Sequence, residues 1–188
     1  MERRRGASRP RGRGRRIAGG RTVVCRGAAD PHGQDPVNEM LRVSSRAAQR
    51  GDVRALAAAE LECFEDPWPG PYFASELLAP ARFHRVLVTP DGTLAAYLFT
   101  AWQYLDLHIL KVATLAAYRR RGLGRKLMVV AEEHARQVAG ETITLEVRTT
   151  NAAAIELYRS LGYEPAGIRP GYYSDLSDAL VMTKRLGE

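Results

Sequence analysis

The stretch KVATLAAYRRRGLGRKLM, residues 111–128, joins the end of an apolar strand to the start of an amphipathic helix through a turn rich in arginine and glycine. A strand that feeds such a turn into a helix N-terminus points several backbone N–H groups at one spot. Gly122 and Gly124 let the main chain approach a ligand without interference from a Cβ atom. Because the helix dipole and the arginines both favour negative charge, this pattern predicts a site for a phosphate or diphosphate.

Two better-known glycine loops do not fit this turn. A P-loop requires Gly-x-x-x-x-Gly-Lys followed by Ser or Thr, whereas a leucine follows the Arg-Lys pair at 125–126. The dinucleotide-binding fingerprint requires a third glycine three residues after Gly124, and that position is Leu127. The pattern that remains is Arg-x-x-Gly-x-Gly, with Arg119, Gly122 and Gly124 as its fixed points.

The chain from residue 41 onward predicts alternating strands and helices. Helical periodicity predicts helices over 51–64, with Asp52 as N-cap, and over 151–162, with Asn151 as N-cap. The proline-rich segment 65–72 is expected to be a loop. The full expected order is strand 41–45, helix 51–64, short helix 73–79, strands 83–88, 93–104 and 107–114, helix 125–140, strand 142–150, helix 151–162, and strands 163–169 and 179–184. This order predicts an α+β fold of three layers, in which a mixed, mostly antiparallel sheet is flanked by helices.

The positive charge of the chain is concentrated at its N-terminus. Residues 1–27 contain ten arginines and one acid, Glu2, for a net charge of +9. Since the whole chain carries +7, residues 28–188 carry −2. A general polyanion-binding domain would carry its excess charge on the folded surface, so this distribution disfavours that class. We expect residues 1–39 to be a disordered, arginine-rich extension and residues 40–188 to form one domain.

The extension leaves three interpretations open: an organelle transit peptide, a tail that makes weak contacts with RNA or the ribosome, or sequence upstream of a true start at Met40. It lacks the apolar core of a secretory signal, and no stretch of the chain has the length of a membrane-spanning helix. Cys25 and Cys63 make neither a disulfide framework nor a metal site, so no metal is expected. We therefore expect a monomeric cytoplasmic protein without membrane contact.

Two segments resemble the signatures of a known superfamily. KVATLAAYRRRGLGRKLM resembles the acetyl-CoA motif of the GNAT N-acetyltransferases, and LEVRTTNAAAIELYRSLGYE, residues 145–164, resembles their second signature in its RimI form. The RimI branch acetylates the N-terminal alanine of a ribosomal protein. The resemblance extends from about residue 41 to 184 and includes Pro-Trp at 67–68 and YYSDLSDALVM at 172–182. Leu115 departs from it, because the RimI pattern usually has an acidic residue there.

The resemblance implies a GNAT fold and an enzyme that uses acetyl-CoA as co-substrate. Cofactor contacts are expected from the main chain of Val112, Ala113 and Thr114, from the turn formed by Arg119, Arg120, Arg121, Gly122, Leu123, Gly124 and Arg125, and from Asn151. On the same grounds Glu146 is expected to be the general base and Tyr158 the general acid. From spacing alone, the favoured interpretation of Glu146 is the partner of a neighbouring charge and that of Tyr158 is a core residue; the resemblance reverses both.

The acceptor is less sharply indicated by the sequence. Trp68, Tyr172 and Tyr173 lie on expected loops, where they either pack at the rim of the domain or line a groove for an acceptor peptide. His84, His108 and His134 have no metal-binding spacing and are expected to be structural or surface residues. The resemblance implies the N-terminal alanine of protein eighteen of the small ribosomal subunit as acceptor. A lysine or small-molecule amine remains an alternative acceptor, and a non-catalytic RNA-docking module remains an alternative class.

Overall fold

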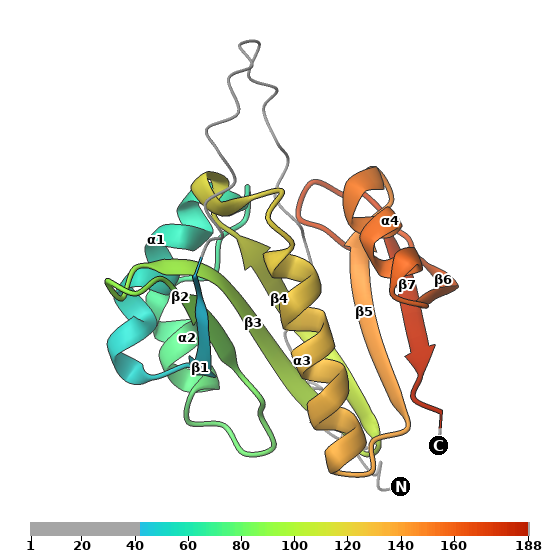
Figure 1. Ribbon diagram of the computed structural model, residues 1–188. Coiled ribbons are helices and arrows are strands. Elements are labelled where there is room, and N and C mark those ends of the chain that lie inside the picture. The colour runs from blue at the N-terminus through green and yellow to red at the C-terminus, as the bar shows by residue number, and fades with distance from the viewer. Residues whose placement is uncertain (1–41, 188) are drawn as a thin grey trace, which may run out of the picture.

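The computed structural model describes residues 42–187 and contains one seven-stranded mixed sheet (Figure 1). The strand order is β1-β2-β3-β4-β5-β7-β6. The strands are β1 (Ser44–Ala47), β2 (Arg85–Val88), β3 (Leu94–Gln103), β4 (Asp106–Thr114), β5 (Thr142–Arg148), β6 (Glu164–Arg169) and β7 (Ala179–Arg185). The pair β4–β5 is parallel, and every other neighbouring pair of described strands is antiparallel. This confirms the expected mixed, mostly antiparallel sheet.

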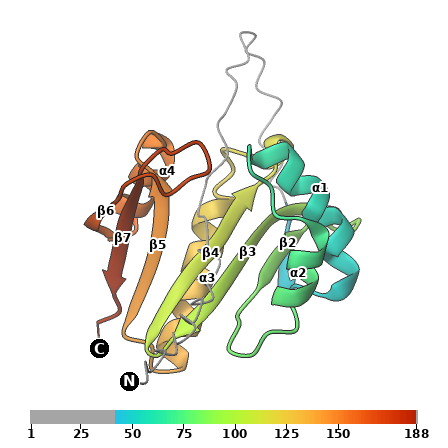
Figure 2. The same cartoon turned by 180° about the vertical axis from the view of Figure 1, so that it is seen from behind.

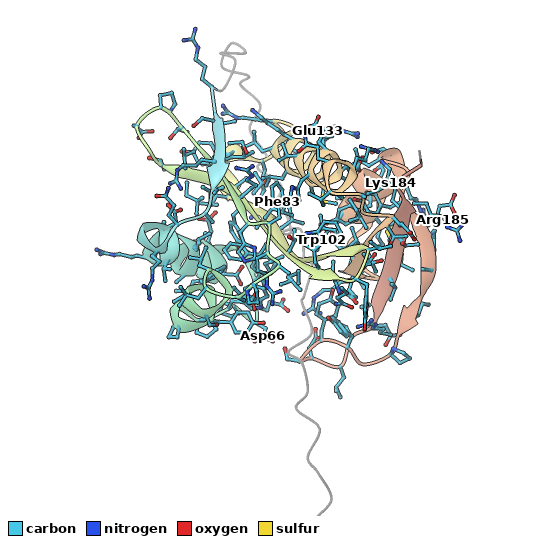
Figure 3. The ribbon with its side chains drawn as sticks, turned by 90° about the horizontal axis from the view of Figure 1, so that it is seen from below. Asp66, Phe83, Trp102, Glu133, Lys184 and Arg185 are labelled. Atoms are coloured by element: carbon cyan, nitrogen blue, oxygen red, sulfur yellow. The ribbon has the colours of Figure 1, made fainter. Side chains whose placement is uncertain are left out.

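Helices cover both faces of the sheet and make three layers (Figures 1 and 2). The α-helices are α1 (Val53–Cys63), α2 (Gly70–Glu76), α3 (Leu123–Gln137) and α4 (Ala152–Ser160), with short 3-10 turns at Arg50–Asp52 and Ala116–Tyr118. One core cluster joins α3 and α4 to the sheet, and a second joins α1 and α2 to the other face. Asp66, which follows α1, and Glu133, which projects from α3, accordingly lie on opposite sides of the sheet (Figure 3).

The second helix differs from the sequence expectation. Helix α2 begins at Gly70, inside the segment 65–72 that we expected to be a loop, and it ends at Glu76 instead of residue 79. Its N-cap is Pro69, and Pro71 occupies its first turn. Proline is tolerated there because the first N–H groups of a helix have no intrahelical acceptor and the ring pre-sets φ. The prolines therefore start this helix, where we had expected them to prevent one.

Asp52 stands at the N-cap position of α1, as expected, but its side chain does not cap the helix. Its carboxylate makes no capping bond to α1. It instead binds both guanidinium nitrogens of Arg46 at 2.7 Å and accepts the backbone N–H of Gln49 at 2.8 Å. Asp52 thus fixes the connection from β1 to α1. By contrast, the cap at Asn151 is confirmed, because its side chain accepts the Ala154 N–H at 3.2 Å.

A β-bulge in β4 decides where the site forms. Phe99 of β3 pairs with Lys111, whereas the next residue, Thr100, pairs with Ile109, so Leu110 is an extra residue in β4. Such a bulge bends its strand and strengthens the local twist. Pairing of β4 with β5 stops at the bulge, with Ile109 opposite Leu145 as its last step. Beyond that step the two strands diverge (Figure 1).

The predicted extension, Met40 and Cys25 lie outside the described residues. Within residues 42–187, no helix has both the length and the apolar character needed to cross a membrane. In the same part of the chain, no group of three or more histidine, cysteine or acidic side chains is placed to hold a metal ion. Cys63 is a buried free thiol, as expected.

His84 is a buried neutral histidine that ties β2 to β3. Its Nδ1 accepts the Thr100 N–H at 3.2 Å, so Nε2 carries the proton and donates to the Glu76 carbonyl at 3.2 Å. The ring stacks on Phe99 with centroids 4.1 Å apart. Burial is the main cause that lowers the pKa of His84 from 6.5 to about 4.

This pKa shift predicts an acid-dependent loss of stability. The unfolded chain binds a proton at His84 below pH 6.5 and the folded chain only below about pH 4, so the contribution of His84 to stability is lost between these values. The slope from this residue is at most about 1.4 kcal/mol per pH unit. The amide of His84→Gln can donate and accept hydrogen bonds in the same places but does not titrate. Its free energy of unfolding, measured with urea, should therefore decline less than that of the unmodified protein between pH 6.5 and 4. Identical pH curves for the two proteins would contradict the assignment.

Candidate functional site

The turn at the start of α3 presents free backbone N–H groups. Arg120 and Gly122 both have positive φ, +61° and +75°, and α3 begins immediately afterwards at Leu123. The N–H groups of residues 120–125 have no acceptor among residues 42–187. No acidic side chain occupies the first turn of α3. Concave arrangements of this kind bind anions, so the backbone here fits the diphosphate that the motif predicts.

The arginines of the turn divide into two groups. Arg119 Nε donates to the Thr114 carbonyl at 3.3 Å, and Arg125 donates to Ser160 Oγ at 2.6 Å. These two side chains brace the turn against the end of β4 and the end of α4. Arg120 and Arg121 are exposed and have no partner within the described part of the chain. They are consequently the two arginines that can move to a bound anion.

Gly124 lies where the turn, β4 and α4 meet. A Cβ atom built on it would be 3.5 Å from Leu157 Cδ2 and 3.9 Å from Thr114 Oγ1. An alanine therefore fits without a clash, whereas a longer side chain would have to enter the space in front of the free N–H groups. Of the remaining cofactor predictions, Asn151 is the α4 cap described above. Val112, Ala113 and Thr114 lie on β4 beyond the last pair with β5.

Glu146 is fully buried on β5 and has two charged or polar neighbours. Its Oε2 lies 2.6 Å from His108 Nε2, and its Oε1 lies 3.0 Å from an Arg169 guanidinium nitrogen. The Gln103 amide nitrogen donates to His108 Nδ1 at 2.9 Å, so the histidine proton lies on Nε2 and points at Glu146. Glu146 is thus held by a chain of hydrogen bonds that begins on β3.

Tyr158 is fully buried, and its hydroxyl has no hydrogen-bond partner among the described residues. Burial, with a smaller contribution from Tyr173, raises the pKa of Tyr158 well above its ordinary value. The phenol is therefore protonated at neutral pH and keeps a proton that it can donate. A buried unpaired hydroxyl costs free energy, so this group fits a ligand atom that accepts its proton.

A pocket of about 310 Å³ lies between the ends of α1 and β5. Its walls come from α1 and the segment after it, from β4, from the residues that follow β5, and from the loop between β6 and β7. The lining residues are Cys63, Phe64, Glu65, Asp66, Lys111, Arg148, Thr150, Asn151, Tyr173, Asp175 and Ser177. The pocket thus opens where β4 and β5 have separated, on the face that carries α1 and α2.

The three aromatic residues predicted to bind substrate are placed differently from one another. Tyr173 lines the pocket and is buried. Tyr172 is half-buried beside it, with ring centroids 5.2 Å apart. Trp68 packs behind the pocket wall, with its ring 4.5 Å from Tyr72 and 5.5 Å from Phe73. Substrate contact by each of the three stays a prediction.

Sequence reasoning missed several charged groups at the site. Lys111 is buried in the pocket wall, 3.0 Å from Glu60 Oε2 and over the ring of Phe64 at 3.9 Å. His108 and Arg169 contact Glu146, and Arg148 lines the pocket, yet none was singled out as functional. Their positions depend on strand pairing between distant segments. The one available signal was alternation along β5, which put Glu146 and Arg148 on the same face.

Known proteins similar to this chain are N-acetyltransferases. Residues 53–163 match the model of the acetyltransferase (GNAT) family. The chain is 35% identical over 156 residues to the N-alpha-acetyltransferase RimI of Mycobacterium tuberculosis, covering 78% of this chain and 94% of that protein. It is 36% identical over 136 residues to the [ribosomal protein bS18]-alanine N-acetyltransferase of Escherichia coli, covering 70% and 89%. The crystal structure of the Escherichia coli ribosomal-protein-S18-alanine N-acetyltransferase matches with a TM-score of 0.72 at 31% identity, covering 78% of this chain and 96% of that one.

The turn makes a direct prediction about ligand binding. Gly124→Glu should weaken coenzyme A binding by at least about 100-fold, or about 2.7 kcal/mol, because its carboxylate enters the diphosphate position. Titration calorimetry measures this, with Gly51→Glu as matched control because a Cβ at Gly51 meets nothing within 4 Å. Tight binding by Gly124→Glu would mean that the diphosphate lies elsewhere.

Proposed function

Because the chain belongs to the acetyltransferase (GNAT) family, we propose that this acetyl-CoA-dependent N-acetyltransferase acts on the N-terminal α-amino group of a protein, the alanine that begins ribosomal protein bS18. The observation that carries the proposal is the pocket at the end of β5, the strand that carries Glu146, combined with likeness over most of the chain to enzymes of that specificity. This acceptor places the reaction in the cytoplasm.

The chemistry of the amine supports an α-amino acceptor. The attacking nitrogen must lose a proton, and an α-amino group has a pKa of about 7.7–8.0, so neutralising it at pH 7 costs only about 1–1.4 kcal/mol. A lysine with a pKa of about 10.4 would cost roughly 4.6 kcal/mol. One buried carboxylate without a second base suits the less basic amine. The lysine or small-amine alternative requires more help than the described residues offer.

Glu146 is the proposed general base. Its Oε2 is engaged by His108, so the proton of the acceptor would be taken at Oε1, directly or through one water, once Arg169 gives way. Arg169 can give way because its side chain is 51% exposed, whereas Glu146 is fully buried. His108 holds the carboxylate in one orientation while this happens.

Tyr158 is the proposed general acid. Bound acetyl-CoA supplies the thioester, and expulsion of its thiolate leaves a strong proton acceptor. The Tyr158 hydroxyl is buried and without a partner within residues 42–187, so it can donate a hydrogen bond to the leaving sulfur and pass its proton on as the thiolate forms. Burial raises the pKa of Tyr158, which keeps the proton on the phenol until that point. The main chain of Val112, Ala113 and Thr114, on β4 beyond its last pair with β5, is the proposed hydrogen-bonding surface for the acetyl oxygen.

The acceptor can be tested with two matched peptides. A peptide beginning Ala-Arg-Tyr-Phe should be acetylated on its α-amine, and the same peptide with a blocked N-terminus and an added lysine should not. Mass spectrometry locates the acetyl group. Transfer to the blocked peptide but not to the free one would contradict the α-amine proposal and favour a lysine acceptor.

The proposed base has its own test. Glu146→Gln keeps the size and the His108 contact but removes the basic oxygen, so kcat should fall by about 10²- to 10⁴-fold. Affinity for coenzyme A should stay close to that of the unmodified protein, because the turn is untouched. Glu156→Gln, on the exposed face of α4, is the control for the lost charge. Unchanged kcat in Glu146→Gln would assign the base elsewhere.

A further inference from the structure

Arg148 makes contacts with both walls of the pocket. It ends β5, and its side chain is only 14% exposed although it lies at the mouth of the pocket. On one side it reaches the loop between β6 and β7, residues 170–178, which we name the β6–β7 loop. On the other it reaches Glu65, just after α1. We propose that Arg148 is a positioning residue that holds these two walls at the spacing the acceptor peptide requires, an inference that rests on the proposed function.

The contacts with the β6–β7 loop are short and numerous. The Arg148 guanidinium donates to Asp175 Oδ2 at 2.6 Å and to Ser177 Oγ, and it lies over the Tyr173 ring, 4.1 Å from the centroid. Asp175 also accepts the N–H and hydroxyl of Ser177, at 3.1 and 2.8 Å. These hydrogen bonds, those from Ser177 first and that from Arg148 after them, lower the pKa of Asp175 to about 2, so the carboxylate is ionised at neutral pH.

The loop depends on this guanidinium for its shape. The Tyr173 N–H donates to the Ser177 carbonyl at 3.1 Å, and the Leu176 N–H donates to the Tyr173 carbonyl at 2.9 Å, which closes a tight turn around Asp175. Leu176 has a positive φ of +62° and is 78% exposed, so it contributes little packing. Arg148 is therefore a buried group that the turn closes on, in addition to the hydrogen bond from the Gly171 N–H to Asp178 Oδ1.

The contact with the other wall is weaker. The Arg148 guanidinium lies 3.7 Å from Glu65 Oε2, and the Glu65 side chain is 79% exposed. An exposed ion pair at this distance contributes little to stability. Arg148 is thus held firmly to the β6–β7 loop, a contact that we name the fixed arm, and only weakly to Glu65. Release of the Glu65 contact would allow a peptide to enter between the two walls.

This role differs from support of the fold. The main-chain pair of Arg148 with Ala179 keeps β5 and β7 together whatever the side chain is. Loss of the guanidinium would free the loop and the pocket mouth while the sheet stays paired. Pre-ordering a binding loop lowers the entropy lost on association, so the effect should fall on acceptor affinity. The cofactor turn at residues 119–125 lies outside these contacts.

The experiment compares Arg148→Gln with Arg54→Gln, an exposed control on α1, in the full-length enzyme. Arg148→Gln should raise KM for the acceptor peptide about tenfold, or about 1.4 kcal/mol, with kcat within about threefold and unchanged affinity for coenzyme A. Arg148→Lys should not rescue KM. Nη1 of Arg148 bonds both Asp175 and Ser177, the guanidinium plane lies over the Tyr173 ring, and Nη2 reaches Glu65, and one ammonium cannot make all of these contacts at once. Glu65→Gln should raise KM less than Asp175→Asn does.

Two further measurements separate the possible failures. Asp175→Asn leaves Arg148 in place and tests its contact with the β6–β7 loop even if Arg148→Gln folds poorly. The double variant Arg148→Gln/Asp175→Asn should have a KM for the acceptor peptide no higher than that of Arg148→Gln alone. Amide hydrogen exchange at residues 171–177 should be faster in Arg148→Gln than in the unmodified protein. This measurement needs no substrate, so it remains valid even if the acceptor is a lysine. Faster exchange with unchanged KM for whichever acceptor is turned over would overturn the proposal. A fall in kcat or in coenzyme A affinity without a rise in KM would overturn it too.

Discussion

The site depends on the step at which β4 stops pairing with β5. The extra residue Leu110 bends β4 away, and from Glu146 onward β5 is paired with β7 alone. Two strands that stayed paired would use their backbone groups on each other. Because they separate, β5 does not use the backbone groups of β4 beyond Ile109, and the pocket forms between the strand ends.

The same step explains why the charged groups converge there. Parallel pairing of Asp106–Ile109 with Thr142–Leu145 brings His108 within hydrogen-bond reach of Glu146, just past the last pair. Beyond that pair none of the described strands lies between β4 and β5, and loops supply part of the pocket walls. Arg148, at the end of β5, reaches Glu65 on the other side of the opening, and Arg169, at the end of β6, reaches Glu146 on β5.

Local chemistry was predictable from the sequence, and long-range placement was not. The turn at residues 119–125, the Asn151 cap and the alternation that puts Glu146 and Arg148 on one face of β5 are each decided within a few residues. The contact between His108 and Glu146 joins residues 38 apart, and its existence depends on strand register. The family resemblance placed Glu146 and Tyr158 at the site but assigned no role to His108. The side chain of Asp52 does not cap α1 as the sequence pattern predicts, because its carboxylate is paired with Arg46.

The central claim is that free main-chain N–H groups at the turn hold the diphosphate of coenzyme A. Amide hydrogen exchange with and without coenzyme A measures those groups directly. The account predicts slower exchange at residues 120–125 when coenzyme A is bound, with no change at Thr142–Leu145, where the strand pairing is already complete. Unchanged exchange at residues 120–125, in protein shown to be saturated with coenzyme A, would contradict it.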